Sequence, residues 1–131
     1  MSKPKRVAIA LIKDHRDNIL FGLRSDSGKF TNPGGHVEDG EDAYCGCVRE
    51  VKEETGLDVV DIKLAKVSWV TKKKLMVYVF DVKVDPNQEI DPSEDPDKEC
   101  SIWAYIDPND IIDQLHVPAE DNILLQYWAN S

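Results

Sequence analysis

The chain has 131 residues, of which 41% are hydrophobic, and carries a formal net charge of −9. This length fits a single compact domain, residues 1–131, that can bury a core. An acidic chain lacks the broad basic face that extended nucleic acid needs, and the apolar run at residues 7–12 is too short for a signal sequence or a membrane span. The odd number of cysteines, three, does not indicate a disulfide framework, so we expect a protein of the reducing cytoplasm.

The first part of the chain is predicted to form two strands. Residues 7–12 are continuously apolar, which is typical of a strand buried on both faces, and residues 19–24 return after a polar turn. The two strands are expected to pair as a hairpin. Residues 25–29 are predicted as a polar loop, and Asn32-Pro33-Gly34-Gly35 as a tight turn whose carbonyl groups can approach an ion.

A helix of about four turns is predicted between Asp42 and Gly56. Asp42 is a suitable N-cap, Gly56 allows a left-handed C-cap, and Glu41 is expected at the positive end of the helix dipole. At about 100° per residue, five side chains form one apolar stripe: Tyr44, Cys47, Val48, Val51 and Thr55. Three carboxylates gather on another face: Glu50, Glu53 and Glu54.

These three carboxylates lie within little more than one helical turn, so they repel one another and a positive group is expected among them. Oxygen ligands at this density suit a hard divalent cation, Mg²⁺ or Mn²⁺, better than Zn²⁺. Arg49 can reach Glu53 four residues further on and hold its rotamer, and Glu41 supplies a fourth carboxylate. The alternative interpretation is a solvated charged face without a ligand.

The second half of the chain is predicted to contain strands at residues 58–70, 75–84 and 102–106. Residues 85–99 hold three prolines and seven acids and are expected to form a loop without regular structure. Helices are predicted at residues 108–115 and 119–128. Together these elements indicate an α/β fold in which a mixed sheet lies between helical layers.

The segment from Gly35 to Leu57 resembles the Nudix box, G-x5-E-x7-R-E-U-x-E-E-x-G-U, where U is an aliphatic residue. Every specified position is filled without a gap, by Gly35, Glu41, Arg49, Glu50, Val51, Glu53, Glu54, Gly56 and Leu57. The resemblance implies the Nudix fold, an α/β/α sandwich with a loop–helix–loop catalytic motif. It also implies a hydrolase that cleaves the pyrophosphate linkage of a nucleoside diphosphate derivative by attack of water on phosphorus.

Carried over position by position, the resemblance implies a site for Mg²⁺ or Mn²⁺ formed by Glu50, Glu53, Glu54 and the Gly35 carbonyl. Glu50 is also the carboxylate expected to orient or deprotonate the water, with Arg49 fixing the cluster. Some Nudix enzymes use an acid outside the box, and Glu99 is the leading candidate for that role. Weaker candidates are Glu94, Asp95 and Asp97; any of these loop acids could instead merely keep the loop solvated.

The expected partner is a small nucleotide, whose class is less strongly indicated. Position 73 holds a lysine, neither the proline of ADP-ribose hydrolases nor the tyrosine of diadenosine polyphosphate hydrolases. Residues 95–99 followed by Trp103 loosely resemble a stretch of small Nudix enzymes that act on nucleoside triphosphates, so a nucleoside or deoxynucleoside triphosphate pyrophosphohydrolase is favoured. The alternatives are hydrolysis of dinucleoside polyphosphates, nucleotide sugars or RNA 5′ ends, and a Nudix-fold module that binds a nucleotide without cleaving it.

Contacts to the base and sugar must lie outside the carboxylate box, because a metal site binds any diphosphate. Phe30, Tyr78 and Phe80 are candidates to stack on a base, although the two strand aromatics are more simply explained as core residues. The cations at residues 72–74, His36 and His116 could touch phosphate but are more simply solvated. No pattern decides the oligomeric state, a homodimer included, and no membrane partner is expected.

Overall fold

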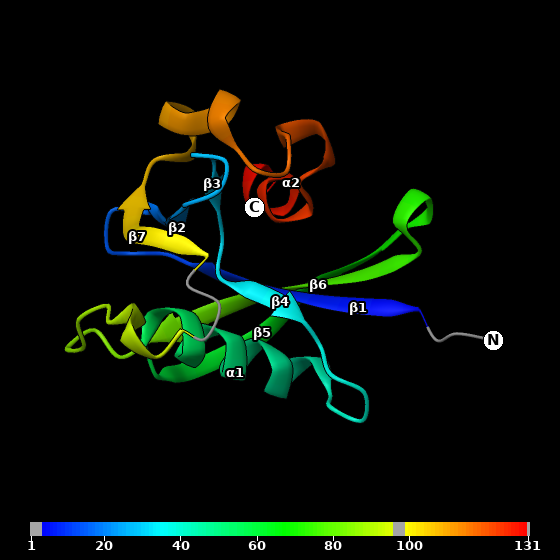
Figure 1. Ribbon diagram of the computed structural model, residues 1–131, viewed down its shortest axis with the longest axis horizontal. Coiled ribbons are helices and arrows are strands. Elements are labelled where there is room, and N and C mark those ends of the chain that lie inside the picture. Colours follow the sequence, from blue (N-terminus) through cyan, green and yellow to red (C-terminus); the bar gives the residue numbers. More distant parts are fainter. Residues whose placement is uncertain (1–3, 96–98, 131) are drawn as a thin grey trace.

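The computed structural model describes residues 4–95 and 99–130, which form two sheets packed with helices (Figure 1). The mixed sheet has the strand order β4-β1-β6-β5 and consists of β1 (Lys5–Ile12), β4 (Gly34–His36), β5 (Val59–Val70) and β6 (Leu75–Val84). The antiparallel sheet has the order β3-β2-β7 and consists of β2 (Ile19–Arg24), β3 (Phe30–Thr31) and β7 (Cys100–Ile106). The helices are α1 (Ala43–Thr55) and α2 (Ile123–Ala129), and the short 3₁₀ segments are η1 (Thr71–Lys73), η2 (Pro92–Glu94), η3 (Pro108–Gln114) and η4 (Ala119–Asp121).

Core clusters cover both faces of the mixed sheet. On one face Ala8 and Ala10 of β1 pack with Cys47 and Val51 of α1. On the other face Leu11 of β1 packs with Val77 and Val79 of β6 and with Leu124 and Leu125 of α2. The prediction that β1 is buried on both faces is confirmed, as is the α/β fold with a mixed sheet between helices.

The prediction that the first two strands pair as a hairpin is wrong. They are joined only by one isolated bridge among the described residues, between Lys13 and Ile19. β1 pairs with β4 and, in parallel, with β6, whereas β2 pairs with β3 and β7. The chain therefore passes from one sheet to the other at this turn. Local apolar patterning could not reveal the crossing, because the partners of both strands come from distant parts of the chain.

The predicted tight turn at Gly34 and Gly35 is instead the start of the edge strand β4. Gly35 lies opposite Ala8, and Gly34 lies opposite Ile9. Gly34 has a φ of +151°, and a β-carbon there would collide with the Ala8 carbonyl oxygen. Glycine is therefore needed for β4 to approach β1 this closely and to lead the chain into α1.

α1 begins and ends at its predicted caps. The Asp42 side chain accepts a hydrogen bond from the Cys45 N–H at 2.8 Å. Gly56 has a φ of +75°, and its N–H donates to the Lys52 carbonyl. The caps hold the helix in a fixed place on the sheet, which positions its acidic face.

The predicted apolar stripe of α1 is only partly buried. Cys47, Val51 and Thr55 are buried, whereas Tyr44 is 45% and Val48 37% exposed. The Tyr44 ring still packs against Phe80, with 4.8 Å between ring centroids. The apolar stripe of α1 is therefore wider than the part of the helix that the sheet covers.

The C-terminal helices are shorter and tighter than predicted. Residues 108–114 form the 3₁₀ segment η3, which is interrupted at Ile111 (φ −128°). α2 begins only after Asn122, whose side chain accepts a hydrogen bond from the Leu125 N–H at 3.1 Å. None of the helices in the described ranges is both long and apolar enough to cross a membrane.

Candidate active site

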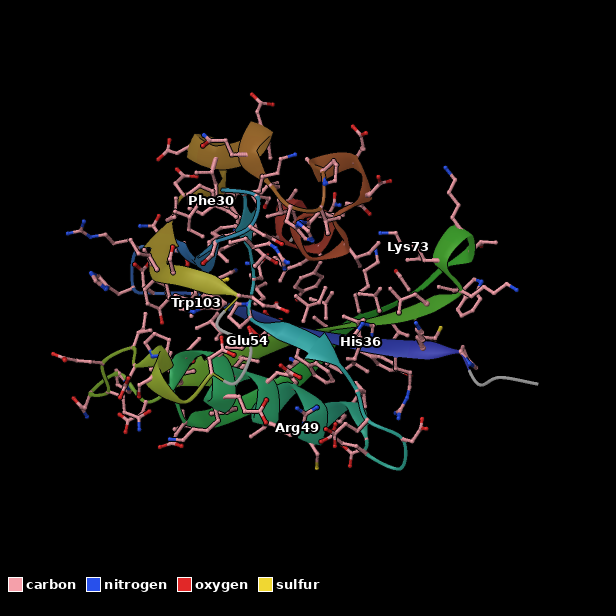
Figure 2. All side chains as sticks on the ribbon, in the orientation of Figure 1. Phe30, His36, Arg49, Glu54, Lys73 and Trp103 are labelled. Carbon is pink, nitrogen blue, oxygen red and sulfur yellow. The ribbon has the colours of Figure 1, made fainter. Side chains whose placement is uncertain are left out.

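Arg49 is the centre of a charged network on α1 (Figure 2). Its guanidinium group lies 2.9 and 3.0 Å from the two oxygens of Glu41, 3.0 Å from Glu50 Oε1 and 3.3 Å from Glu53 Oε2. Its Nη2 also donates to the His36 carbonyl at 3.2 Å. The hydrogen bonds with Glu41 are the main cause that raises the pKa of Arg49 above its usual value. Arg49 thus reaches Glu53 as the sequence predicted, and ties the helix to the end of β4.

Glu41 directly precedes the N-cap Asp42, at the N-terminal end of α1. The helix begins at Ala43, and the Glu41 carboxylate turns towards Arg49. Its Oε1 also accepts a hydrogen bond from the Glu38 N–H at 3.1 Å. The bonds from Arg49 lower the pKa of Glu41. Glu41 therefore fixes the position of Arg49 and is not a fourth carboxylate available to a ligand.

The Glu50 carboxylate lies directly against the backbone of β4. A β-carbon at Gly35 would be 2.8 Å from the Glu50 carboxyl carbon and 2.9 Å from each of its oxygens. Any larger residue at position 35 would displace this carboxylate. The first glycine of the box thus has a physical reason, which is to let an acid of α1 approach the strand.

Glu54 is the deeper member of a carboxyl pair with Glu50. Its Oε1 accepts a hydrogen bond from the Gly34 N–H at 3.1 Å, and the two carboxyl groups are hydrogen-bonded to each other. Burial, assisted by the nearby charges of Glu50 and Asp95, raises the pKa of Glu54 to about 9, and burial also raises the pKa of Glu50. At neutral pH the pair therefore shares a proton.

This donor set fits a hard divalent cation. Two adjacent, half-buried carboxyl groups that share a proton would be stabilised by a cation in its place. The donors that face the Gly35 backbone are all oxygens, which favours Mg²⁺ or Mn²⁺ over softer metals. As the side chains stand, no trio of acidic, histidine or cysteine groups within residues 4–95 and 99–130 forms a ready metal cluster, since Arg49 holds Glu53 and Glu50.

The structure separates the acids of the loop before β7. Glu99 is exposed and forms an ion pair with Arg24, with Nη1 3.5 Å from Oε2. Asp95 is only 5% exposed and is close enough to Glu54 to contribute to its raised pKa. Asp97 lies outside the described residues, as does the side chain of Glu94. Asp95, predicted to be a weaker candidate than Glu99, is thus the loop acid that approaches the box.

The three predicted base-stacking aromatics lie in different surroundings. Phe80 is fully buried, so the alternative interpretation of it as a core residue is correct. Tyr78 is half-buried and packs against the same cluster, on the α1 side of the sheet. Phe30 is half-buried and packs against the cluster on the opposite face, next to Leu115. Phe30 and Tyr78 therefore lie on opposite faces of the mixed sheet.

Cys100 and Trp103 of β7 approach the box from the second sheet, which the sequence did not predict. Burial is the main cause that raises the pKa of Cys100 to about 12, and the nearby Glu54 adds to it. A β-carbon at Gly22 would lie 2.7 Å from Cys100 Sγ and 2.9 Å from the Trp103 ring. The buried Trp103 Nε1 has no hydrogen-bond partner among the described residues. Both residues lie on β7, which is far from the box in the sequence and pairs with β2, so no spacing pattern could have marked them.

The geometry described above defines a class of site: an oxygen-lined carboxylate helix, braced by arginine, that suits a divalent cation and a diphosphate. The family model described as NUDIX domain matches residues 3–127, so the chain belongs to the Nudix family, whose hydrolases generally use divalent metal ions.

Similar proteins include a relative from a plant and two solved structures. Nudix hydrolase 10 of Arabidopsis thaliana is 39% identical over 49 residues, which are 37% of this chain but only 18% of that protein. The crystal structure of a MutT protein from Methanosarcina mazei is 26% identical, with a TM-score of 0.67 over 99% of this chain and 97% of the other. An ADP-ribose pyrophosphatase from Streptococcus suis is 24% identical, with a TM-score of 0.77 over 98% and 94%. At this identity, the likeness to the Streptococcus suis structure shows only that the two chains share a fold.

Proposed function

We propose that this chain is a metal-dependent hydrolase that cleaves the pyrophosphate linkage of a nucleoside diphosphate derivative, with a nucleoside or deoxynucleoside triphosphate as the favoured substrate. The observation that carries the proposal is the half-buried Glu50–Glu54 pair, which lies against Gly35 and is held by Arg49. A non-catalytic nucleotide-binding module would have no need for this full set of acids.

Glu50, Glu53, Glu54 and the Gly35 carbonyl would hold the cation, Mg²⁺ or Mn²⁺. When bound, the cation supplies charge neutralisation of the diphosphate and a lower pKa for the attacking water. Arg49 holds Glu50 Oε1 at 3.0 Å, and once the cation replaces the proton shared with Glu54, the Glu50 carboxylate would orient the water and accept its proton. The water oxygen forms the new bond to phosphorus, the bridging P–O bond breaks, and the leaving phosphate takes the electron pair.

Glu99 is the second candidate for the carboxylate that accepts the proton of the water. Its ion pair with Arg24 counts against this role. Its carboxylate would have to leave Arg24 before it could act on a water, although an exposed pair at 3.5 Å breaks easily. Asp95 lies nearer to Glu54 and would act on the cluster electrostatically. Glu50 is therefore the base that we favour, with Arg49 as its positioning residue.

The substrate class rests on weaker support than the reaction. The MutT name of one similar structure and the ADP-ribose pyrophosphatase name of another point to different substrates. We favour a triphosphate because Lys73 departs from the residues expected for ADP-ribose or diadenosine polyphosphate hydrolases. Dinucleoside polyphosphates, nucleotide sugars and RNA 5′ ends are the alternative substrates.

A nucleotide panel tests the proposal. Each compound is incubated with the protein and Mg²⁺ or Mn²⁺, and the products are separated by ion-exchange chromatography, which shows which P–O bond is cut. We expect cleavage of one class, abolished by EDTA and strongly reduced in Glu50→Gln. Binding of a nucleotide without cleavage, under either metal, would instead identify a sensor module.

A further inference from the structure

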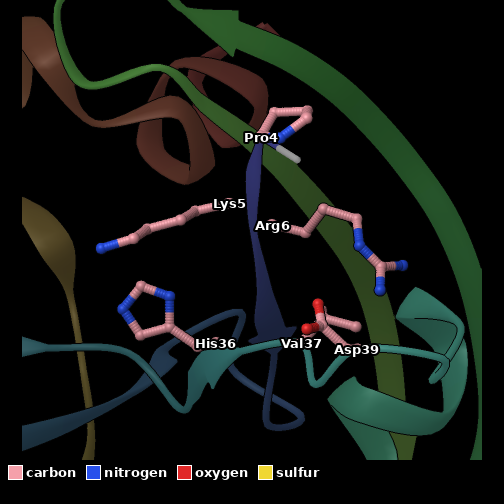
Figure 3. A pocket seen from close by; sticks show the side chains of 6 residues that line it. All are labelled: Pro4, Lys5, Arg6, His36, Val37 and Asp39. Carbon is pink, nitrogen blue, oxygen red and sulfur yellow. The ribbon is translucent and has the colours of Figure 1, made fainter. Parts of the chain in front are cut away.

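Lys5 and His36 lie next to each other on the face of the mixed sheet that is opposite α1 (Figure 3). His36 is opposite Val7 in the β1–β4 pair, and alternation along β1 brings Lys5 to the same face as Val7. Figure 3 shows the two side chains pointing the same way, while Arg6 and Asp39 point to the other side of β1. These six residues line a cavity of about 260 Å³: Pro4, Lys5, Arg6, His36, Val37 and Asp39.

The side chains of Lys5 and His36 make no ion pair or hydrogen bond with the part of the chain that the structure describes. Other cations near the box are occupied. Arg49 holds three carboxylates, and Arg6 donates to the Glu38 carbonyl at 3.0 Å. Two adjacent side chains that can carry positive charge, left without acidic partners in a chain of net charge −9, suit an anion from outside the protein.

The cavity is joined to the carboxylate cluster through β4. Gly35 lies against Glu50, and the next residue, His36, accepts a hydrogen bond from Arg49 through its carbonyl and projects its ring to the opposite face. β4 is an edge strand, only three residues long. A chain of phosphates held by a cation beside the Gly35 carbonyl would therefore need to cross only this edge to reach Lys5 and His36.

The same face of the sheet continues towards the predicted base contact. Figure 2 shows Phe30 and Lys73 on the other side of β1 from Arg49. The Phe30 carbonyl accepts a hydrogen bond from the His116 N–H at 2.8 Å, and Lys73 is close enough to His116 to help lower its pKa, after burial and Arg24. Cationic groups thus border this face at separate points.

We propose that Lys5 and His36 form an anion subsite that holds a third phosphate group, beyond the diphosphate bound at the carboxylate cluster. The inference rests on the proposed function and makes it more specific, because a nucleoside triphosphate offers a third phosphate and ADP-ribose or a nucleotide sugar does not. An ammonium and an imidazole both donate hydrogen bonds to phosphate oxygens, and neither requires a metal to do so.

The first test measures anion binding without a metal or any turnover. The chain has three histidines, so the ring signals of ¹⁵N-labelled protein can be assigned with His36→Gln and His15→Gln. Inorganic tripolyphosphate is titrated in EDTA. The expected result is a saturable shift of the His36 signal that is weakened several-fold in Lys5→Ala, restored in Lys5→Arg and unchanged in Lys63→Ala, an exposed lysine on β5. A His36 signal that does not move would overturn the subsite.

The second test identifies the group that the subsite holds. With Mg²⁺, kcat/KM is measured for the best triphosphate of the nucleotide panel and for ADP-ribose. Lys5→Ala and His36→Gln are expected to lower the triphosphate-to-ADP-ribose ratio about three- to fivefold each, as loss of a partly exposed charge contact allows, while His15→Gln leaves it unchanged. An unchanged ratio in both variants, despite normal turnover, would overturn the assignment to a third phosphate.

Absence of turnover with every compound would instead contradict the proposed function. The tripolyphosphate titration would still decide the subsite, because it requires neither metal nor catalysis. Melting curves of the five variants identify any loss of fold, which is not expected because the four substituted residues are all exposed: Lys5, His15, His36 and Lys63.

Discussion

Arg49 donates hydrogen bonds to both carboxylate oxygens of Glu41, at 2.9 and 3.0 Å, although the two residues are eight positions apart and Glu41 precedes the helix. The pair closes the loop between β4 and α1 over the start of the helix. Because the same guanidinium also holds Glu50 and Glu53, the orientation of these two acids depends on a residue that is itself not a metal ligand.

Glu41→Gln is expected to lower kcat about tenfold or more, as is typical when a residue that orients a metal ligand is lost. The amide keeps the shape of the side chain but loses the charge that fixes Arg49. Steady-state kinetics with the best nucleotide measures the effect. The control is Glu38→Gln, because Glu38 is an exposed acid of the same loop that contacts Glu41 through its backbone N–H. Equal activity of Glu41→Gln and wild type would show that Arg49 is held adequately by Glu50 and Glu53.

Glu50→Gln is expected to lower kcat by about 10²-fold or more with little change in KM, because an interaction made in the transition state is lost. Glu99→Gln is expected to lose much less, since its carboxylate pairs with Arg24 at the surface. Asp95→Asn, measured beside them, reports on the buried loop acid. A crippled Glu99→Gln together with an active Glu50→Gln would move the base out of the box.

The metal-free protein is expected to lose stability as the pH rises from about 6 to 9. The pKa of Glu54 is about 9 in the folded state, above the ordinary value of a glutamate, so the folded state keeps a proton in this range that the unfolded state has released. By linkage, the free energy of unfolding then falls with rising pH, and this contribution levels off above the folded-state pKa.

Thermal melts in EDTA at several pH values test this expectation in wild type and Glu54→Gln. The variant carries no titrating carboxyl group at position 54, so its melting temperature should fall less over the same range, and the difference between the two proteins reports on the Glu50–Glu54 pair. Parallel curves for the two proteins would contradict the raised pKa. Added Mn²⁺ should raise the melting temperature of wild type most at high pH, where Glu54 has lost its proton.

Gly35→Ala is expected to damage activity without unfolding the protein. The new β-carbon would lie 2.8 Å from the Glu50 carboxyl carbon, so the side chain must move away from β4 and from its place beside Glu54. We expect a loss of kcat of about 10²-fold, comparable to a catalytic group displaced by about 1 Å. Weaker Mn²⁺ binding, followed by electron spin resonance, should accompany it; normal activity would show that Glu50 has room to adapt.

The features that could be predicted from the sequence are those that depend on residues close together in the chain. The caps Asp42 and Gly56 and the reach of Arg49 to Glu53 follow from helix geometry, and the structure has them. The partners of β1 and β2 could not be predicted, because both are apolar strands that fit either sheet. The approach of Cys100 and Trp103 to the box depends on that same pairing, so it was hidden for the same reason.

Phe30 tests whether base recognition lies on the face opposite α1. The sequence presented it as a poorly covered aromatic, but its ring is half-buried against the cluster that contains Leu11, Phe21 and Leu115, so Phe30→Ala would combine a packing defect with any lost contact. Phe30→Leu is the sharper variant. A leucine retains most of the apolar volume at a cost in stability below about 1.5 kcal/mol, while the flat ring that a base stacks on is removed.

We expect Phe30→Leu to melt close to wild type and to raise KM several-fold for the best nucleotide, since stacking of one base contributes about 1–3 kcal/mol. Its affinity for tripolyphosphate, which has no base, should not change. Tyr78→Leu is the matched control, because Tyr78 is equally half-buried but lies on the α1 side of the sheet. If Tyr78→Leu raises KM and Phe30→Leu does not, the base binds on the α1 side and Phe30 serves only to pack β3 against the C-terminal core.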